Sequence, residues 1–341
     1  MPGGRETVVI TGAAAGVGRA AARAFGRRGA NVGLLARGVA GLEAAAQEVR
    51  HLGGAALTVP TDVADAEAVE RAASAVEERF GPIDIWVNCA MATIFSPFAD
   101  LTPQEYRRAT EVTYFGYVYG TMAALRRMRV RDHGTIVQVG SALAYRAIPL
   151  QSVYCGAKFA IRGFTDSIRS ELIHDKSRVH LTMVQMPALN TPQFDWGRNK
   201  TGRRAQPVPP IFQPELAAEA IVFAAHARRR EIYVGKSSLQ AIVANKIMPG
   251  LLDRYLASSG YSGQSTDEPV PPDAPDNLYE PVPRDYGAHG RFDEVAKGWS
   301  TQFWLTRHRS SLLAGAGLAA AAAMVWLSPG GRRYAQRLLP R

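Results

Sequence analysis

Apolar and polar positions along the chain alternate between two patterns. Short apolar runs rich in β-branched residues are followed by longer amphipathic stretches, as expected when buried strands are joined by covering helices. The strand-like runs are 7–11, 31–36, 55–60, 83–88, 135–140, 179–186 and 231–234; the helix-like stretches include 19–28, 42–52, 66–80, 152–171, 214–228 and 236–255. Repeated strand–helix units with Gly and Pro between them predict an α/β fold, a doubly wound parallel sheet with helices on both faces.

This regular pattern stops near residue 257. Residues 258–290 are rich in Pro, Asp and Gly and show little periodicity, so we expect an extended linker. Residues 310–327 are free of charge and are flanked by arginines on both sides. The chain is therefore expected to contain four parts: an α/β domain over 1–257, a Pro-rich linker and tail over 258–309, a candidate transmembrane helix over 310–327 and a basic C-terminus over 328–341.

The stretch 310–327 is long enough to cross a bilayer. As a helix it rises about 27 Å, close to the thickness of about 30 Å of a hydrocarbon core. Ala and Gly dominate it, so an Ala-rich helix that docks on the domain or pairs with a second subunit is the alternative. The linker before this stretch favours a membrane anchor, because a flexible linker would let a cytoplasmic catalytic domain stand away from the membrane to which the helix tethers the chain.

Composition adds a few constraints to this picture. The 341 residues are 47% hydrophobic, which fits a globular protein. Cys89 and Cys155 lie in or beside predicted core elements, suit a reducing compartment and do not suggest a metal site. The net charge of +10 permits binding to nucleic acid or to an anionic membrane, but no nucleic-acid-binding module is present in the sequence, so no nucleic acid is expected. Residues 1–5 are too few for a signal peptide before the first strand, which predicts a cytosolic catalytic part.

A glycine-rich turn follows the first strand and opens the first helix. It contains Thr11, Gly12, Gly16, Val17 and Gly18. Gly12 permits a sharp turn, Gly16 lets the backbone approach a pyrophosphate, and Gly18 lets the helix pack on the strand. The free amides at the helix start favour phosphate charge. The turn therefore predicts a Rossmann-type dinucleotide site, because strand, turn and helix occur in the required order.

Arg37 directly follows the second strand. In a Rossmann-type unit this position lies beside the adenosine ribose, where an acidic residue would hold the 2′-hydroxyl. A guanidinium suits a 2′-phosphate instead. The sequence therefore favours NADP(H) over NAD(H), with a surface arginine that binds no ligand as the alternative.

A candidate reaction site comprises Ser141, Tyr154 and Lys158. Ser141 falls at the end of the strand over 135–140, and the other two residues lie four positions apart on one face of a helix. A phenol titrates near pH ~10, and a neighbouring ammonium favours the phenolate and lowers its pKa. A serine hydroxyl beside it could hold a carbonyl or carbinol oxygen during hydride transfer.

In this order, the motifs resemble the short-chain dehydrogenase/reductase superfamily over about residues 6–234. The matching segments are Thr11–Gly18, Asp62-Val63, Asn88, Ser141, Tyr154, Lys158 and 187–191. The resemblance implies that Tyr154 is the general acid or base, that Lys158 lowers its pKa and holds the nicotinamide ribose, and that Ser141 orients the substrate oxygen. It also implies a homo-dimer or homo-tetramer.

The same resemblance implies further cofactor contacts. Asp62 and Val63 would lie at the adenine, Asn88 and Ala90 would follow the fourth strand, and the turn from Pro187 to Thr191 would meet the nicotinamide carboxamide. Three positions depart from the family pattern: Met91 and Ala188 each replace a glycine, and Thr113 stands where an asparagine commonly supports a proton-relay water. A threonine hydroxyl can also hold water, with different reach.

The expected function is that of an NADP(H)-dependent oxidoreductase that interconverts a carbonyl and an alcohol. Residues 192–212 resemble an active-site lid in place and length. Its aromatic side chains, Phe194, Trp196 and Phe212, suit a lipophilic substrate, although packing onto the domain would explain them equally well. The rival function is a non-catalytic NADP(H)-binding redox sensor or membrane scaffold, which Met91 and Thr113 keep open.

Overall fold

A computed structural model describes residues 4–327 of the chain, and it divides into two compact units after Ser300. The predicted basic C-terminus, 328–341, lies outside the described residues. The first unit is built on a seven-stranded sheet with the strand order β10-β7-β6-β4-β1-β2-β3. Its strands are β1 (Thr7–Thr11), β2 (Asn31–Ala36), β3 (Ala55–Pro60), β4 (Ile85–Asn88), β6 (Thr135–Ser141), β7 (His180–Met186) and β10 (Glu231–Tyr233).

Every neighbouring pair in this sheet is parallel. The strand order reverses between β1 and β4, which is the point where such sheets bind ligands. The prediction of a Rossmann-type α/β fold with a parallel sheet is therefore confirmed. The runs at 7–11, 31–36 and 55–60 became strands with the predicted bounds. β1 is buried along its length, as expected of a strand covered on both faces, whereas β3 at the edge of the sheet is only partly buried.

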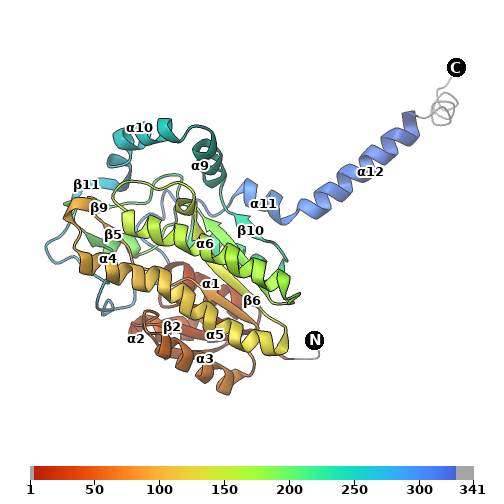
Figure 1. Ribbon diagram of the computed structural model, residues 1–341, viewed down its shortest axis with the longest axis horizontal. Helices are drawn as coiled ribbons and strands as arrows, with labels where there is room; N and C mark the ends of the chain where they lie inside the picture. Colours follow the sequence, from red (N-terminus) through yellow and green to blue (C-terminus); the bar gives the residue numbers. More distant parts are fainter. Residues whose placement is uncertain (1–3, 328–341) are drawn as a thin grey trace. The chain divides into compact units, whose positions relative to one another are not determined.

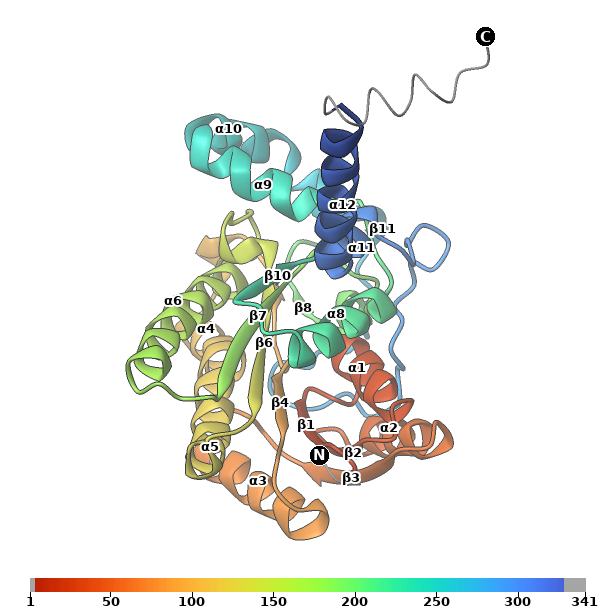
Figure 2. The same ribbon diagram turned by 90° about the vertical axis from the view of Figure 1, so that its right-hand side faces the viewer.

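Helices cover both faces of the sheet (Figure 1). Viewed along the sheet edge, one layer holds α1 (Gly16–Gly26), α2 (Val39–His51) and α8 (Pro214–His226), and the other holds α3 (Ala66–Phe80), α4 (Pro103–Thr110), α5 (Gly116–Arg131) and α6 (Ser152–His174) (Figure 2). The core lies between the sheet and these layers, where Trp86, Phe25 and Ile10 are fully buried. This arrangement leaves the ends of the strands open for a site.

Two helices deviate from regular geometry. A π turn over Glu111–Phe115 joins α4 to α5, and such turns are frequent at functional sites. The predicted helix over 236–255 is two helices, α9 (Lys236–Ile247) and α10 (Pro249–Ser259). Pro249 separates them because it has no amide hydrogen to continue α9 and suits the first position of a new helix.

Short elements lie outside the main sheet. They are β5 (Ile94–Phe95), α7 (Gln193–Trp196), β8 (Arg198–Asn199), β9 (Arg203–Ala205), β11 (Ser265–Pro269) and 3₁₀ turns at Phe98–Asp100, Ala142–Ala144 and Ser262–Gln264. β5 pairs with β8, and β9 pairs with β11. The predicted lid, 192–212, is therefore tied to the domain by two small sheets.

Residues 258–300 differ from the expected extended linker, because they fold back on the domain. Leu278 is fully buried, the amide of Gly290 donates to the carbonyl of Asn190, and Phe292 packs edge-on against Phe194. A few apolar and charged side chains supply contacts that the Pro- and Gly-rich composition does not reveal. The domain boundary near 257 stays a prediction, whereas the first compact unit runs to Ser300.

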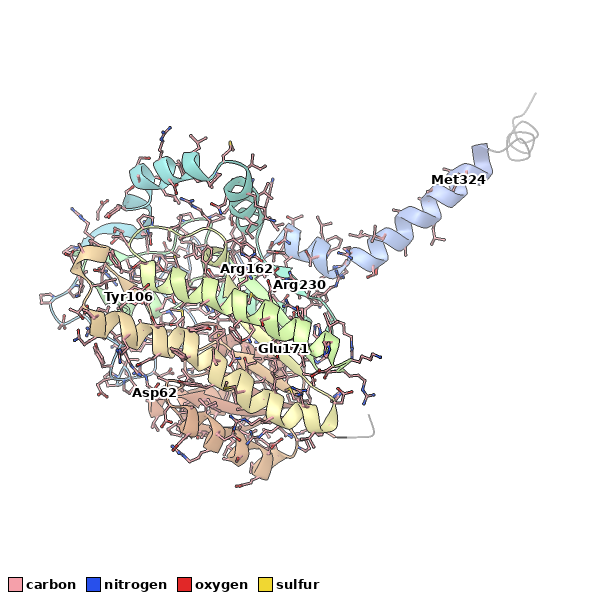
Figure 3. The ribbon with its side chains drawn as sticks, in the orientation of Figure 1. Asp62, Tyr106, Arg162, Glu171, Arg230 and Met324 are labelled. Carbon is pink, nitrogen blue, oxygen red and sulfur yellow. The ribbon has the colours of Figure 1, made fainter. Side chains whose placement is uncertain are left out.

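The second unit contains α11 (Thr301–Arg307) and α12 (Arg309–Leu327). Across residues 4–327, no helix is both long enough and apolar enough to cross a membrane. The transmembrane helix predicted over 310–327 is thus not supported; Ala and Gly make up half of that stretch, and both partition into lipid only weakly. Met324, labelled in Figure 3, is 68% exposed.

Candidate active site

A cleft of about 1100 Å³ lies at the carboxyl ends of the parallel strands. Strand ends of one parallel sheet meet at one edge, so residues far apart in sequence converge there. Thirteen predicted site residues line the cleft: Gly12, Gly16, Val17, Gly18, Arg37, Asp62, Val63, Ala90, Ser141, Tyr154, Lys158, Pro187 and Thr191. Thr11, Asn88 and Thr113 do not line it.

The glycine turn forms a cradle that side chains would fill. Gly12 and Gly16 have φ of +70° and +54°, which favours glycine. A Cβ on Gly12 would lie 2.8 Å from the Cα of Ala90, and one on Gly18 would overlap the carbonyl oxygen of Gly12. The bare backbone lets a phosphate come close to the start of α1, so these residues fit a dinucleotide.

Ser141 and Tyr154 meet in the cleft. Ser141 is the last residue of β6, and its Oγ accepts a hydrogen bond of 3.1 Å from the amide of Leu143. Burial raises the pKa of Tyr154, and a hydrogen bond with Ser141 offsets part of that rise. The direction is opposite to the lowered pKa expected from the sequence, because burial outweighs the other influences. Tyr154 is consequently a neutral phenol at pH 7, the form that can donate a proton.

Lys158 lies one helical turn from Tyr154 and is 2% exposed. Its Nζ donates to the carbonyl of Val139 at 2.7 Å and to the hydroxyl of Tyr117 at 3.0 Å, and lies 5.5 Å from the centre of the Tyr154 ring. Burial lowers the pKa of Lys158 to about 8. The ammonium is therefore held in place by neutral groups and carries a desolvation cost.

Two neighbours of Lys158 were not predicted. Tyr117 is buried on α5, and its hydroxyl donates to the carbonyl of Val139 at 2.8 Å. Cys89 lines the cleft after β4, and burial raises the pKa of its thiol to about 12 although Lys158 opposes the rise. The helical spacing of four residues between Thr113 and Tyr117 was the available sequence signal for Tyr117.

Thr113 lies in the π turn and is fully buried. Its hydroxyl donates to the carbonyl of Ala92 at 2.8 Å and accepts from the amide of the same residue at 2.9 Å. The side chain thus fastens the loop after β4 to the helix layer. Its role in holding a relay water stays a prediction.

Thr11 and Asn88 support the cleft from beneath. The Thr11 hydroxyl accepts from the amides of Cys89 and Ala90 at 2.9 and 3.1 Å. The Asn88 amide group accepts from the Trp86 indole at 2.8 Å and donates to the Gln138 side chain at 2.9 Å. Asn88 thus ties β4 to β6, and Thr11 fixes the loop that carries Met91, a residue that lines the cleft. The backbone there accepts a side chain in place of the family's glycine.

Charged side chains gather where β2 and β3 end. Asp62, labelled in Figure 3, pairs with Arg108 at 2.6 Å. The Arg37 guanidinium donates to the backbone carbonyls of residues 277–279, at 2.5 Å for Tyr279. Burial lowers the pKa of Arg37. Arg37 therefore lines the cleft, as predicted, but also holds the C-terminal segment of the domain.

Mostly apolar side chains line the other end of the cleft. Phe194 and Trp196 of the predicted lid line the cleft, whereas Phe212 is buried outside it. Leu252 and Leu256 of α10 form part of the wall, and α9 and α10 lie beyond one end of the sheet (Figure 2). The sequence pattern did not predict this wall, because α10 is distant in the chain from Ser141, Tyr154 and Lys158.

Comparisons with known proteins agree with this geometry. Residues 6–200 match a family model described as short chain dehydrogenase. An uncharacterized oxidoreductase, YxnA of Bacillus subtilis (strain 168), is 33% identical over 296 residues, which cover 86% of this chain and 82% of that protein. The 3-dehydrosphinganine reductase of Danio rerio is 30% identical over 224 residues, which cover 63% of this chain and 67% of that protein.

One solved structure with a similar fold is an alcohol dehydrogenase from the archaeon Thermococcus sibiricus, complexed with 5-hydroxy-NADP. It aligns with a TM-score of 0.57 and 27% sequence identity, covering 67% of this chain and 96% of that one. The similarity therefore extends over nearly all of that enzyme and over about two thirds of this chain.

Proposed function

Because this chain belongs to the short-chain dehydrogenase family, we propose that it is an NADP(H)-dependent oxidoreductase that interconverts a carbonyl and an alcohol on a lipophilic substrate. The observation that carries the proposal is the meeting of Ser141, Tyr154 and Lys158 in the cleft that the glycine turn also lines. Hydride transfer to a carbonyl requires a proton donor and groups that hold the carbonyl oxygen close to the dinucleotide. Tyr154, Ser141 and Lys158 supply a phenol, a second hydroxyl and a buried cation at that place.

Tyr154 and Ser141 act on the substrate oxygen. In the reduction, both hydroxyls hold the carbonyl oxygen, and Tyr154 gives it a proton as negative charge develops. The raised pKa of Tyr154 keeps that proton in place at neutral pH until the oxygen becomes basic enough to take it. A nicotinamide, when bound, supplies the hydride. The oxidation runs the same proton transfer in reverse.

Lys158 supports this proton transfer. Its pKa of about 8 leaves it mainly protonated at pH 7, although it is buried. An ammonium near the phenol stabilises the phenolate that remains after the proton has moved. Tyr117 and the Val139 carbonyl position that ammonium through their hydrogen bonds, and Lys158 also holds the nicotinamide ribose.

The substrate end of the cleft supports a lipophilic carbonyl or alcohol. Leu252 and Leu256 present apolar side chains there, which stabilise an alkyl chain by removing it from water. The Danio rerio relative is named for the reduction of 3-dehydrosphinganine.

The test is turnover by the full-length protein with a panel of ketones and aldehydes of increasing chain length, followed as loss of NADPH absorbance. We expect turnover that improves with chain length. Tight NADPH binding without reduction of any carbonyl or oxidation of any alcohol would instead favour the non-catalytic binding protein.

Cofactor choice gives a separate prediction. A charge-assisted pair between Arg37 and a 2′-phosphate contributes about 1.5 to 3 kcal/mol, so NADPH should bind at least about tenfold more tightly than NADH. Arg37→Ala should remove that difference, as measured by calorimetric titration of both cofactors. Equal affinities in the unchanged protein would contradict the assignment. An equal loss for both cofactors would show that Arg37 acts only through the carbonyls of 277–279.

A further inference from the structure

Residues 276–291, here called the strap, follow the whole length of the dinucleotide half of the cleft. The strap begins at Arg37, which the carbonyls of 277–279 contact at the end of β2. It ends at the turn after β7, where the amide of Gly290 donates to the carbonyl of Asn190. These two places are the predicted ribose and nicotinamide ends of the site, so the middle of the strap lies over the predicted pyrophosphate position.

The middle of the strap is fixed to the start of α1. Arg19, which is 3% exposed, forms ion pairs with Glu48 at 3.0 Å and with Asp285. The Asp285 carboxylate also accepts from the amide of Gly287 at 3.0 Å. The Asp285 carboxylate is therefore paired with a guanidinium, which reduces the repulsion that it exerts on an incoming anion.

A backbone carbonyl of the strap also accepts a hydrogen bond from an amide of the glycine turn. The amide of Gly16 donates to the carbonyl of Gly287 at 3.1 Å. Amides at this end of a helix are the ones that a pyrophosphate uses. A dinucleotide that takes this amide must displace the Gly287 carbonyl, so the strap and the cofactor are coupled at this point.

Arg284 is the cation that the strap brings to the cleft. It is exposed and lines the cleft, and its guanidinium lies 4.6 Å from the centre of the Tyr286 ring. Tyr286 packs edge-on against Trp196 at 4.8 Å, which holds this part of the strap over the cleft. Within residues 4–327, Arg284 has no carboxylate at ion-pair distance. Its charge is therefore available to a ligand.

We propose that the strap is part of the cofactor site, and that Arg284 binds the pyrophosphate of the dinucleotide while the strap closes over it. The inference rests on the proposed use of a dinucleotide. A guanidinium suits this ligand because its fork of donors matches two phosphate oxygens. The 2′-phosphate is the other anion within the same cofactor, but it belongs to the end of the strap near Arg37, several residues before Arg284.

The first test compares three probes with the full-length protein: ADP, which carries only the pyrophosphate, 2′-AMP, which carries only the 2′-phosphate, and NADPH. Arg284→Ala should weaken ADP and NADPH about tenfold, the scale of one charge-assisted hydrogen bond, and leave 2′-AMP unchanged. Arg27→Ala is the matched control, because it removes one exposed positive charge at the opposite end of α1. It should change none of the three dissociation constants.

Two results of this titration would overturn the proposal. Unchanged ADP binding by Arg284→Ala would mean that Arg284 does not meet the pyrophosphate. A loss confined to 2′-AMP and NADPH would assign Arg284 to the 2′-phosphate instead.

The second test is amide hydrogen exchange of residues 276–291 with and without saturating ADP. Closure over the ligand should slow exchange along the strap, and unchanged exchange would contradict closure. Neither test involves turnover. A protein that reduces no carbonyl but passes both would refute the proposed enzyme activity and keep this inference.

Discussion

Tyr154→Phe is expected to lower turnover by at least about 10²-fold, the usual contribution of a general acid. Burial already favours the neutral form of this side chain. The substitution removes only its hydroxyl and leaves the ring in place, so the shape of the cleft should be kept. Without that hydroxyl only the Ser141 hydroxyl remains beside the developing alkoxide, and a serine hydroxyl is a much weaker acid than a phenol. The dissociation constant for NADPH should stay within about twofold, since no phosphate contact is lost.

The measurements are kcat with a ketone that the unchanged protein reduces, and NADPH affinity by titration. Tyr119→Phe is a suitable control, because it also removes one tyrosine hydroxyl. Tyr119 lies on α5, stacks on Phe115 and does not line the cleft. Turnover close to normal in Tyr154→Phe would show that another group supplies the proton, and Ser141 would then be the next candidate.

The fold and the convergence of the candidate site residues in one cleft were predictable for the same physical reason. Strands buried on both faces leave continuous apolar runs, and their ends mark where a ligand can bind, which located Gly12, Arg37 and Ser141 from the pattern alone. Helical spacing then placed Tyr154 and Lys158 together. The helical spacing is a local feature and the apolar runs recur with each strand, so both can be recognised in the sequence itself.

The strap could not be predicted because its contacts are neither local nor periodic. Arg37 and Tyr279 are separated by 242 residues, and Arg19 and Asp285 by 266. Several of the contacts use backbone carbonyls, which every residue possesses and which leave no mark on side-chain composition. The direction of the Tyr154 pKa was likewise beyond the sequence, since it depends on burial by parts of the chain far from the helix.

Lys158→Met is expected to stabilise the cofactor-free protein at pH 7 while it impairs catalysis. Burial lowers the pKa of Lys158 from an ordinary value of 10.5 to about 8. Keeping the charge in that environment costs on the order of 3 kcal/mol at 1.36 kcal/mol per pKa unit. The Tyr117 hydroxyl and the Val139 carbonyl remain bonded to each other at 2.8 Å after the substitution, so neither loses its last partner. A net gain of about 1 to 3 kcal/mol is expected.

The gain should depend on pH in a defined direction. Between pH 8 and 10.5 the folded chain has released the Lys158 proton while the unfolded chain still holds it. The unfolded state then binds more protons, so this residue makes the unchanged protein more stable as the pH rises through that window. The Lys158→Met protein lacks this increase. Its advantage should be full below pH 8 and should shrink toward pH 10.5.

Urea unfolding of the full-length proteins at pH 7 and at about pH 9.5 measures this difference. Lys246→Met is the control, because Lys246 is exposed on α9 and has no burial cost to lose. Its stability relative to the unchanged protein should be the same at both pH values. A Lys158→Met protein that is less stable at pH 7, or whose difference does not change with pH, would show that the buried ammonium carries no cost. The expected result would mean that this lysine is kept for chemistry at the expense of stability.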